Sequence, residues 1–267
     1  MANILAMYKG MVLSNDIITC DIHEMKILCL DIMKEDILPG QFIHIKIPQA
    51  SHLLLRRPIS IHHIDKQNNY LSIIYQIRGE GTRILSAIRR DHSIDFLGAL
   101  GTGFKMPENA KSVMLVGGGI GIAPLRYIFD YWKDKEYSSF LGFRNQNTSY
   151  AIDVFRNHSK HIFVATDDGS LGERGNIALL FAREIAKHQP DIVMACGPVL
   201  MLKCIQEQTK KYQVSCQISL EERMGCGIGG CLVCNCKTRM GDQWVYKRVC
   251  VDGPVFDGRE VILNDRL

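Results

Sequence analysis

The chain has 267 residues, 46% of them hydrophobic, and a formal net charge of +4. This length suggests two or three modules with ordinary hydrophobic cores. The small net charge and the lack of any block of Lys or Arg argue against nucleic-acid binding. No run of 18 uncharged apolar residues occurs, which argues against a membrane span. The N-terminal residues lack the pattern of a signal peptide, so we expect a cytoplasmic protein.

The first hundred residues predict a small antiparallel barrel. Short alternating or β-branched runs recur there, separated by Gly, Pro, Asn and Asp, and closely spaced short strands of this kind are typical of barrels. One short helix is expected at residues 81–90. The runs that predict strands are DIITCDI (16–22), MKILCLDI (25–32), FIHIKIP (42–48), ISIHHI (59–64) and LSIIYQI (71–77).

From about residue 112 the pattern changes to strands that alternate with helices. This alternation predicts a parallel, doubly wound sheet. A last strand is expected in residues 214–224, leading to a cysteine-rich segment. The expected strands are 112–118, 138–143, 161–167 and 191–197, and the expected helices are 122–134, 150–158, 176–188 and 198–211.

The final fifty residues contain half of the ten cysteines. They are too few to form an independent core and would need a staple such as a metal cluster. The spacing Cys226-x4-Cys231-x2-Cys234, followed by Cys250, is the plant-type [2Fe–2S] arrangement. Spacing alone leaves Cys236 as an alternative fourth ligand, and we favour Cys250. A structural zinc knuckle and a redox disulfide are further alternatives.

A glycine run, LVGGGIGIAPL, follows one expected strand and opens the next expected helix. There a diphosphate could approach backbone amides. The run departs from the G-x-G-x-x-G fingerprint, so a tight turn without a ligand is an alternative. Two further segments, 166–176 and 195–201, also follow strands and would lie at the same sheet edge. The candidate glycines are Gly117, Gly118, Gly119 and Gly121.

The barrel region carries a second candidate site, in RRPIS (56–60) and GEGT (79–82). An Arg beside the amide-rich start of a helix could clamp a diphosphate. The alternative is that Arg56 and Arg57 lie on a solvated strand edge and bind no ligand.

These motifs, with TDDGS, CGP and CGIGGCLVC…VCVDGPVF, occur in the order found in the ferredoxin–NADP reductase superfamily. More narrowly, nearly the whole chain resembles the electron-transfer subunits of B-type dihydroorotate dehydrogenase. The resemblance implies an FAD-binding β-barrel in residues 1–104, an NAD-binding α/β domain in 105–215 and a [2Fe–2S] domain in 216–267.

The resemblance also implies roles for individual residues. Arg57 would bind the FAD diphosphate, with Gly81 and Thr82, while Ser60 would lie near the flavin ring. Cys196 would lie near the nicotinamide as the catalytic candidate, and the glycine run would flank NAD. The further flavin contacts would be Pro58, Ile59, Ile74, Tyr75 and Gln76, and the cluster ligands would be Cys226, Cys231, Cys234 and Cys250.

We therefore expect a subunit that passes electrons from a dihydroorotate-oxidising flavoprotein through [2Fe–2S] and FAD to NAD+, in pyrimidine biosynthesis. Its partner would be the catalytic FMN-containing subunit, in a hetero-oligomer such as a heterotetramer. One alternative is a related NAD(P)H-linked subunit that serves ferredoxin, sulfide or sulfite chemistry, or a hydrogenase. The other is a zinc-stapled binding or sensor protein without enzymatic activity.

Overall fold

The computed structural model describes residues 6–48, 50 and 52–263. The expectation about a signal peptide, and the outermost ends of the expected barrel and cluster domains, fall partly on residues outside these ranges. None of the helices in the described part of the chain is long and apolar enough to cross a membrane.

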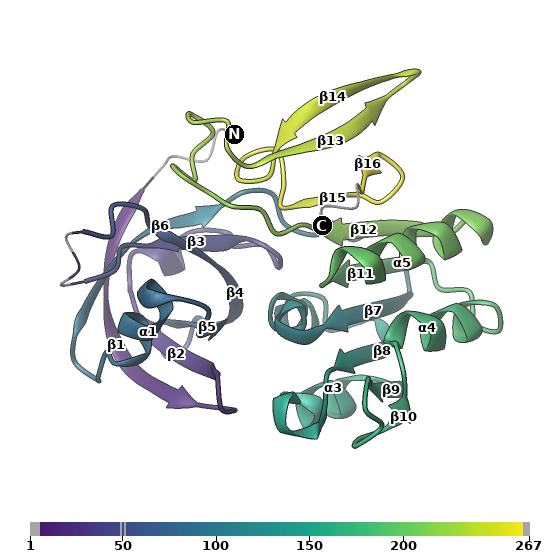
Figure 1. The fold of residues 1–267 in the computed structure, drawn as a ribbon, viewed down its shortest axis with the longest axis horizontal. Coiled ribbons are helices and arrows are strands. Elements are labelled where there is room, and N and C mark those ends of the chain that lie inside the picture. Colours follow the sequence, from purple (N-terminus) through teal and green to yellow (C-terminus); the bar gives the residue numbers. More distant parts are fainter. Residues whose placement is uncertain (1–5, 49, 51, 264–267) are drawn as a thin grey trace.

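The first part of the chain folds into a closed six-stranded barrel, which confirms the predicted architecture (Figure 1). Neighbouring strands pair antiparallel, in the order β1-β2-β5-β4-β3-β6. The short helix α1, Glu80–Ser86, packs Leu85 into the barrel core, and a 3-10 turn, η1, spans Ile32–Lys34. The strands are β1 Met7–Ile17, β2 Ile22–Leu28, β3 Phe42–Ile45, β4 Arg57–Asp65, β5 Tyr70–Gln76 and β6 Ser93–Leu100.

The strand prediction was wrong at two places in the barrel. Residues 18–21 of the run DIITCDI form the bend between β1 and β2, and β1 begins much earlier, at Met7. β6 was not predicted as a strand. Gly10 in β1 and Gly98 in β6 interrupt the side-chain alternation, and each leaves room for an Ile of the neighbouring strand.

The middle of the chain forms a seven-stranded sheet in the order β10-β9-β8-β7-β11-β12-β15. Every pair is parallel except β12 with β15, so the predicted parallel sheet is confirmed and acquires one antiparallel edge. The strands are β7 Ser112–Gly118, β8 Glu136–Phe143, β9 His161–Thr166, β10 Glu173–Arg174, β11 Ile192–Cys196, β12 Ser215–Ser219 and β15 Val255–Asp257.

Helices cover both faces of this sheet. Phe181 of α4 and Ile205 of α5 pack on one face, whereas Leu125 of η2 and Phe155 of α3 pack on the other. The prediction of one long helix over 122–134 was wrong, because this stretch divides into a 3-10 segment that contains Pro124 and a short α-helix. The helical elements are η2 Gly119–Leu125, α2 Tyr127–Tyr131, η3 Gln146–Thr148, α3 Ile152–His158, α4 Ile177–Ile185 and α5 Val199–Lys211.

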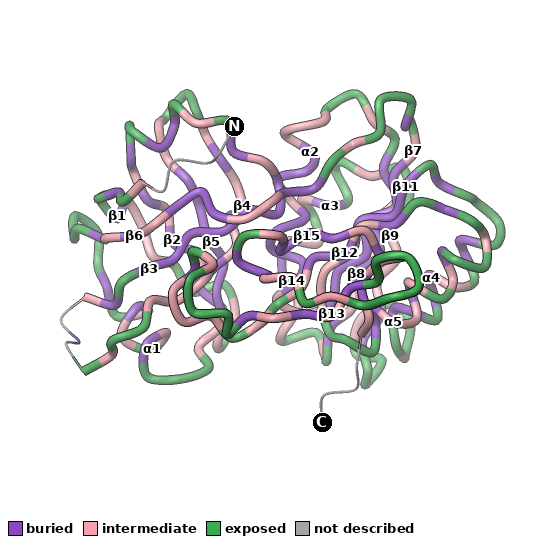
Figure 2. Tube along the Cα trace, turned by 90° about the horizontal axis from the view of Figure 1, so that it is seen from above, coloured by how far each residue is buried: buried purple, intermediate pink, exposed green. Residues whose placement is uncertain are grey.

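The C-terminal segment builds a small third sheet in the order β14-β13-β16. Figure 1 shows the β13–β14 hairpin standing out from the rest of the molecule, and Figure 2 shows its turn exposed. The segment does not make a core of its own: Cys234, Val249, Phe256 and Val261 join the core beneath α4 and α5. The strands are β13 Asn235–Met240, β14 Gln243–Arg248 and β16 Val261–Ile262.

Two histidines of β4 connect the barrel to the helical segments that pack on the parallel sheet. The buried His62 ring lies 2.7 Å from the Ala123 carbonyl of η2, and His63 lies 2.7 Å from the Asp130 carboxylate of α2. Arg126 contacts both His63 and Asp130. Burial lowers the pKa of His62 to about 3, and burial followed by the charge of Arg126 lowers the pKa of His63 to about 4. Both rings therefore stay neutral in the folded protein over the physiological range.

Acid should destabilise the fold through His62. An unfolded histidine protonates near its ordinary pKa of about 6.5, so below that pH the unfolded state binds more protons than the folded state. The free energy of unfolding should fall as the pH drops from about 6.5 to about 3, as urea denaturation at several pH values can measure. In His62→Asn the fall should be shallower, with His63 still contributing. An unchanged slope in this variant would contradict the assignment.

Candidate cofactor and cluster sites

The four predicted cluster thiols occur as two pairs. Cys226 and Cys231 each donate a backbone N–H to the other's Sγ, at 3.4 Å, and Ile228 donates a further N–H to Cys226 Sγ at 3.4 Å. The backbone N–H of Cys250 donates to Cys234 Sγ, also at 3.4 Å. The described residues contain no group of three or more His, Cys, Asp or Glu side chains placed to hold one ion. Two thiol pairs match a two-iron cluster with two cysteines on each iron.

The amides in this loop favour the thiolate form of Cys226, and thiolate is the form that binds iron. Burial raises the pKa of Cys226, but the N–H groups of Ile228 and Cys231 outweigh it and lower this pKa to about 7. Cys236 lies in β13 opposite Lys247 and is buried in the same core as Cys250. Burial raises the pKa of Cys236 to about 11 and that of Cys250 to about 12, so thiol acidity does not distinguish them. The N–H that Cys250 donates to Cys234 Sγ does. The arrangement pairs Cys250, rather than Cys236, with Cys234.

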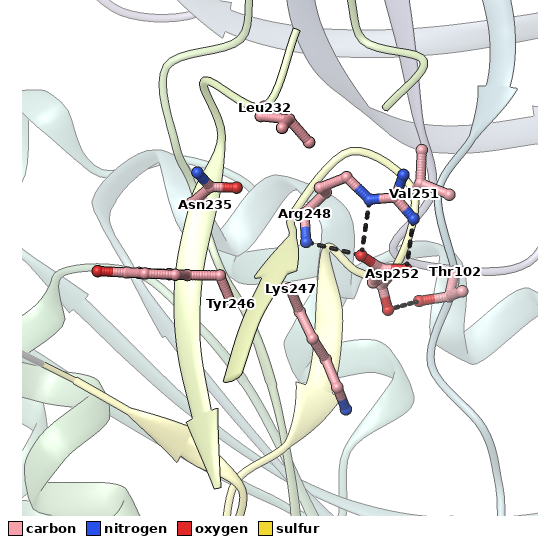
Figure 3. A pocket seen from close by; sticks show the side chains of 8 residues that line it. All are labelled: Thr102, Leu232, Asn235, Tyr246, Lys247, Arg248, Val251 and Asp252. Carbon is pink, nitrogen blue, oxygen red and sulfur yellow. Dashed lines mark hydrogen bonds and ion pairs between the residues drawn. The ribbon is translucent and has the colours of Figure 1, made fainter. Parts of the chain in front are cut away.

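An arginine–aspartate pair supports the turn that carries Cys250. Arg248 donates from Nε to Asp252 Oδ2 at 3.0 Å and from its second guanidinium nitrogen to Oδ1 at 3.2 Å (Figure 3). Arg248 also donates to the Gly229 carbonyl in the cysteine loop, at 3.4 Å. Thr102, just after β6, donates its hydroxyl to the Asp252 carbonyl at 3.3 Å. This network therefore ties both halves of the cluster segment to the end of the barrel.

The same residues border a surface hollow of about 850 Å³ beside the cluster segment. Leu232 and Tyr246, both 57% exposed, line it together with the Arg248–Asp252 pair (Figure 3). Trp244 is 54% exposed and packs edge-on against Tyr246, and Lys237 lies 4.4 Å over the Trp244 ring. Large exposed apolar side chains gathered in this way mark interaction surfaces.

The candidate flavin residues line up along β4, β5 and the start of α1. The Arg57 guanidinium lies directly over Gly81, where a Cβ would stand 2.6 Å from Arg57 Nε. The Thr82 hydroxyl accepts the N–H groups of Arg78 and Gly79, at 3.0 and 3.3 Å, and so closes the turn before α1. This leaves a cation against the backbone of Gly81, which fits a diphosphate.

Side-chain direction divides the remaining flavin candidates. Ile59 and Tyr75 point into the barrel core, where the Tyr75 hydroxyl donates to Asn15 Oδ1 at 2.8 Å. Ile74 points outward and packs with the core of the parallel sheet. Pro58, Ser60 and Gln76 are half-buried, and Gln76 donates to Asp21 Oδ2 at 2.5 Å. Of these six residues, Pro58, Ser60 and Gln76 are therefore the ones that retain exposed surface for a ring system.

The glycine run and the CGP motif meet at the carboxyl edge of the parallel sheet. Gly117 is the register partner of Cys196, and a Cβ on Gly121 would lie 2.5 Å from the Cys196 carbonyl oxygen. A Cβ on Gly118 would lie 2.7 Å from Pro198 Cδ. Gly119, at φ +54°, has open space where its Cβ would be. The turns pack tightly on each other and leave open space beside Gly119.

The chemical state of Cys196 limits what it can do. Burial raises its pKa to about 12, so at neutral pH it is a neutral thiol and not a thiolate nucleophile. It can contact a cofactor through an uncharged, polarizable sulfur. The segment 166–176 follows strand β9, and there Asp168 accepts the backbone N–H and the hydroxyl of Ser170, at 2.9 and 2.6 Å. That geometry identifies Asp168 as a turn former.

Comparison with known proteins agrees with this arrangement. Residues 221–262 match the family described as the iron-sulfur cluster binding domain of dihydroorotate dehydrogenase B. "Dihydroorotate dehydrogenase B (NAD(+)), electron transfer subunit" of Caldanaerobacter subterraneus subsp. tengcongensis is 39% identical over 95% of this chain and 98% of its own length. The protein of the same name from Enterococcus faecalis strain V583 is 41% identical over 87% of this chain and 90% of its own. The chain belongs to this family. It is an oxidoreductase subunit, and the predicted resemblance is confirmed.

Solved structures extend the likeness beyond these electron transfer subunits. A chain from an NADH-dependent reduced ferredoxin–NADP oxidoreductase, studied for flavin-based electron bifurcation, is 27% identical and superposes with a TM-score of 0.82. That match covers 95% of this chain and 90% of the other. The ferredoxin reductase of carbazole 1,9a-dioxygenase shares the fold. It is 18% identical, with a TM-score of 0.65, and the match covers 80% of this chain and 67% of the other.

The sequence patterns did not single out two residues that lie at these sites. Tyr150 is buried below the glycine run and donates its hydroxyl to the carbonyls of Gly119 and Ile120, at 3.2 Å each. His44 is fully buried, and its ring lies against Gly227 in the cysteine loop. Neither stands in a motif of its own, and only the alternation FIHIKIP, which places a polar ring between apolar neighbours, hinted at His44.

The tight contact between the two turns can be tested with Gly121→Ala. The added Cβ meets only backbone atoms of Cys196 and Gly197, so neither turn can yield easily, and we expect a loss of about 1–3 kcal/mol in the free energy of unfolding. Gly119→Asn is the matched control in the same turn, since its space is open and Asn tolerates a positive φ. Urea denaturation compares the two. Equal stabilities would show that the turns are not in contact as described.

Proposed function

We propose that this chain carries electrons from a dihydroorotate-oxidising partner subunit to NAD+, with a [2Fe–2S] cluster on the partner side and FAD on the NAD side. The observation that carries the proposal is the pairing of four thiols in an iron–sulfur domain joined directly to a reductase fold. The reaction serves pyrimidine biosynthesis, in which dihydroorotate is the substrate oxidised. When bound, FAD exchanges hydride with nicotinamide and single electrons with an iron–sulfur cluster.

Each of the three sheets belongs to a part of the chain that binds one cofactor. Residues 1–104 bind FAD, residues 105–215 bind NAD, and residues 216–267 bind the cluster. The cluster part is not self-contained, because β15 completes the sheet of the NAD-binding part. None of the ten cysteines forms a disulfide, in keeping with a reducing cytoplasmic location.

On the flavin side, Arg57 neutralises the FAD diphosphate, and Gly81 lets the phosphates approach the backbone. Thr82 holds the turn that presents these amides. Ser60 and Pro58 face the ring system from β4, while the buried Ile59 and Tyr75 fix the strands beneath it. Ile74 and Gln76 line the side that faces the nucleotide sheet.

On the nucleotide side, the turn made by Gly117, Gly118, Gly119 and Gly121 binds the NAD diphosphate through its backbone. Cys196 contacts the nicotinamide as a neutral thiol, so it orients the ring and does not transfer a proton. Cys226, Cys231, Cys234 and Cys250 hold the cluster, and the amides in their loop stabilise its sulfur ligands.

The hollow lined by Leu232, Tyr246 and Val251 is the docking surface for the catalytic, FMN-containing subunit. It adjoins the cluster ligands, so docking there brings the partner close to the cluster. Its exposed aromatic residues are of the kind that dominates binding energy at protein interfaces. The complex is a hetero-oligomer such as a heterotetramer.

The choice of fourth cluster ligand can be tested directly. Cys250 and Cys236 are similarly buried, at 2% and 6% exposure, so replacing either with Ala removes a comparable amount of packing. Cys250→Ala should abolish visible iron–sulfur absorbance and leave FAD bound, whereas Cys236→Ala should keep both. The reverse pattern would exchange the roles of the two residues, and loss in neither variant would refute the cluster assignment.

Function can be tested by purifying the complex from its native host without oxygen. Dihydroorotate should bleach both flavin and cluster absorbance, and added NAD+ should then yield NADH. A yellow-brown complex that NADH bleaches but dihydroorotate does not would assign the chain to ferredoxin, sulfide, sulfite or hydrogenase chemistry instead. A colourless chain would indicate the zinc-stapled alternative.

The docking surface can be tested in the same assay with one variant on the surface and one control variant away from it. Tyr246→Ala should weaken binding to the catalytic subunit by about tenfold or more, with a parallel loss of dihydroorotate-driven NADH formation. Leu179→Ala, on the exposed side of α4, should change neither. Reduction of the isolated chain by NADH should be the same in both variants, so a loss there would signal damage to the fold.

A further inference from the structure

His44 occupies a junction between the flavin-binding strands and the cluster segment. It lies in β3, in register with Pro58 of β4 and Leu97 of β6. Its side chain points out of the barrel and is 0% exposed. The segment that leads from β12 toward the hairpin passes over this side of the barrel (Figure 1), and there a Cβ on Gly227 would overlap His44 Nδ1. The contact therefore requires glycine one residue after Cys226.

The His44 ring is buried without a completed hydrogen bond. Neither Nδ1 nor Nε2 has a partner among the described residues. Buried polar groups are nearly always hydrogen-bonded, so an unpartnered buried ring needs an explanation. Burial lowers the pKa of His44, and the carbonyls of Arg56 and Cys226 oppose that shift. Neither carbonyl meets the geometry of a hydrogen bond, so both are candidate acceptors for the ring N–H.

The two carbonyls belong to the two sites that the chain has to connect. Arg56 directly precedes the flavin residue Arg57, and Cys226 is the first of the paired thiols. The neutral imidazole has one N–H to donate. Nδ1 is the ring atom closest to the position that a Gly227 Cβ would take, so this nitrogen faces the loop that carries the Cys226 carbonyl.

We propose that His44 is a positioning residue that holds the cluster loop against the flavin-binding strands, by donating a hydrogen bond from its ring to the Cys226 carbonyl. The inference rests on the proposed function, since it assigns a role between the two cofactors. Retention of the cluster depends on His44, whereas hydride exchange between NADH and the flavin does not. Groups that orient metal ligands in this way commonly change metal affinity about 10–100-fold when they are replaced.

The test compares His44→Leu with His44→Asn. The Asn amide can donate a hydrogen bond from a position near that of Nδ1, whereas Leu has similar size and cannot donate. Each variant is purified without oxygen with its cofactors, and three quantities are followed: loss of cluster absorbance in EDTA, the electron paramagnetic resonance spectrum of the reduced cluster, and bleaching of the flavin by NADH. His44→Leu should lose its cluster about tenfold faster than the parent and show an altered spectrum. His44→Asn should stay close to the parent, and flavin bleaching should be equal in all three.

The outcomes separate this inference from the proposed function. If His44→Leu lost its cluster no faster than the parent, the role of the hydrogen bond would be overturned and the proposed function would stand. The same would follow if His44→Leu and His44→Asn lost the cluster equally fast. A parent chain that binds no cluster would overturn both.

A second pair of variants keeps the test decisive if His44→Leu does not fold. Gly227→Ala pushes the loop away from an intact His44, and Gly241→Ala adds the same side chain at a similar positive φ, +61° against +74°, where nothing lies within 4 Å. The first should lose cluster about tenfold faster and keep FAD, and the second should match the parent. Equal behaviour of the two would also refute the contact.

Discussion

The contact between the end of the barrel and the turn around Gly253 is the constraint on which the rest of the molecule depends. Thr102 donates its backbone N–H to the Gly253 carbonyl at 2.5 Å, and Val255 returns an N–H to Thr102 at 3.4 Å. A Cβ on Gly101 would lie 2.5 Å from the same Gly253 carbonyl. Barrel, cluster turn and parallel sheet meet here, because Val255 opens β15. Their relative placement is therefore fixed by backbone atoms, which no side-chain rotamer change can loosen.

This junction explains why one chain can serve three cofactors. Electron transfer requires cofactors held at fixed separations, whereas separately tethered domains would let those separations vary. The barrel and the parallel sheet also share an apolar core, to which Ile22 and Ile74 of the barrel contribute. His62 and His63 add polar contacts at the rim. The interface thus combines burial, which supplies stability, with directed hydrogen bonds, which set orientation.

Sequence patterns predicted the elements whose periodicity is uninterrupted. β7 runs Ser112–Gly118 as expected, and α5 covers nearly the whole of 198–211, because strong alternation or helical spacing continues to their ends. The prediction was wrong where local chemistry breaks the period, as at Pro124 in η2. The cysteine spacing pointed to the cluster, but no local pattern could reveal the contact of His44 with Gly227 or that of Thr102 with Gly253. These depend on residues more than a hundred positions apart, which only the folded chain brings together.

The antiparallel strand β15 has a consequence for how the protein is made. Without it, β12 would be an open edge, whose unpaired N–H and C=O groups can join other chains. The parallel sheet therefore gains its last strand only after the chain has been synthesised to residue 257. A chain that ended within the cysteine-rich stretch would lack cluster ligands. It would also leave the backbone N–H and C=O groups on one side of β12 unpaired.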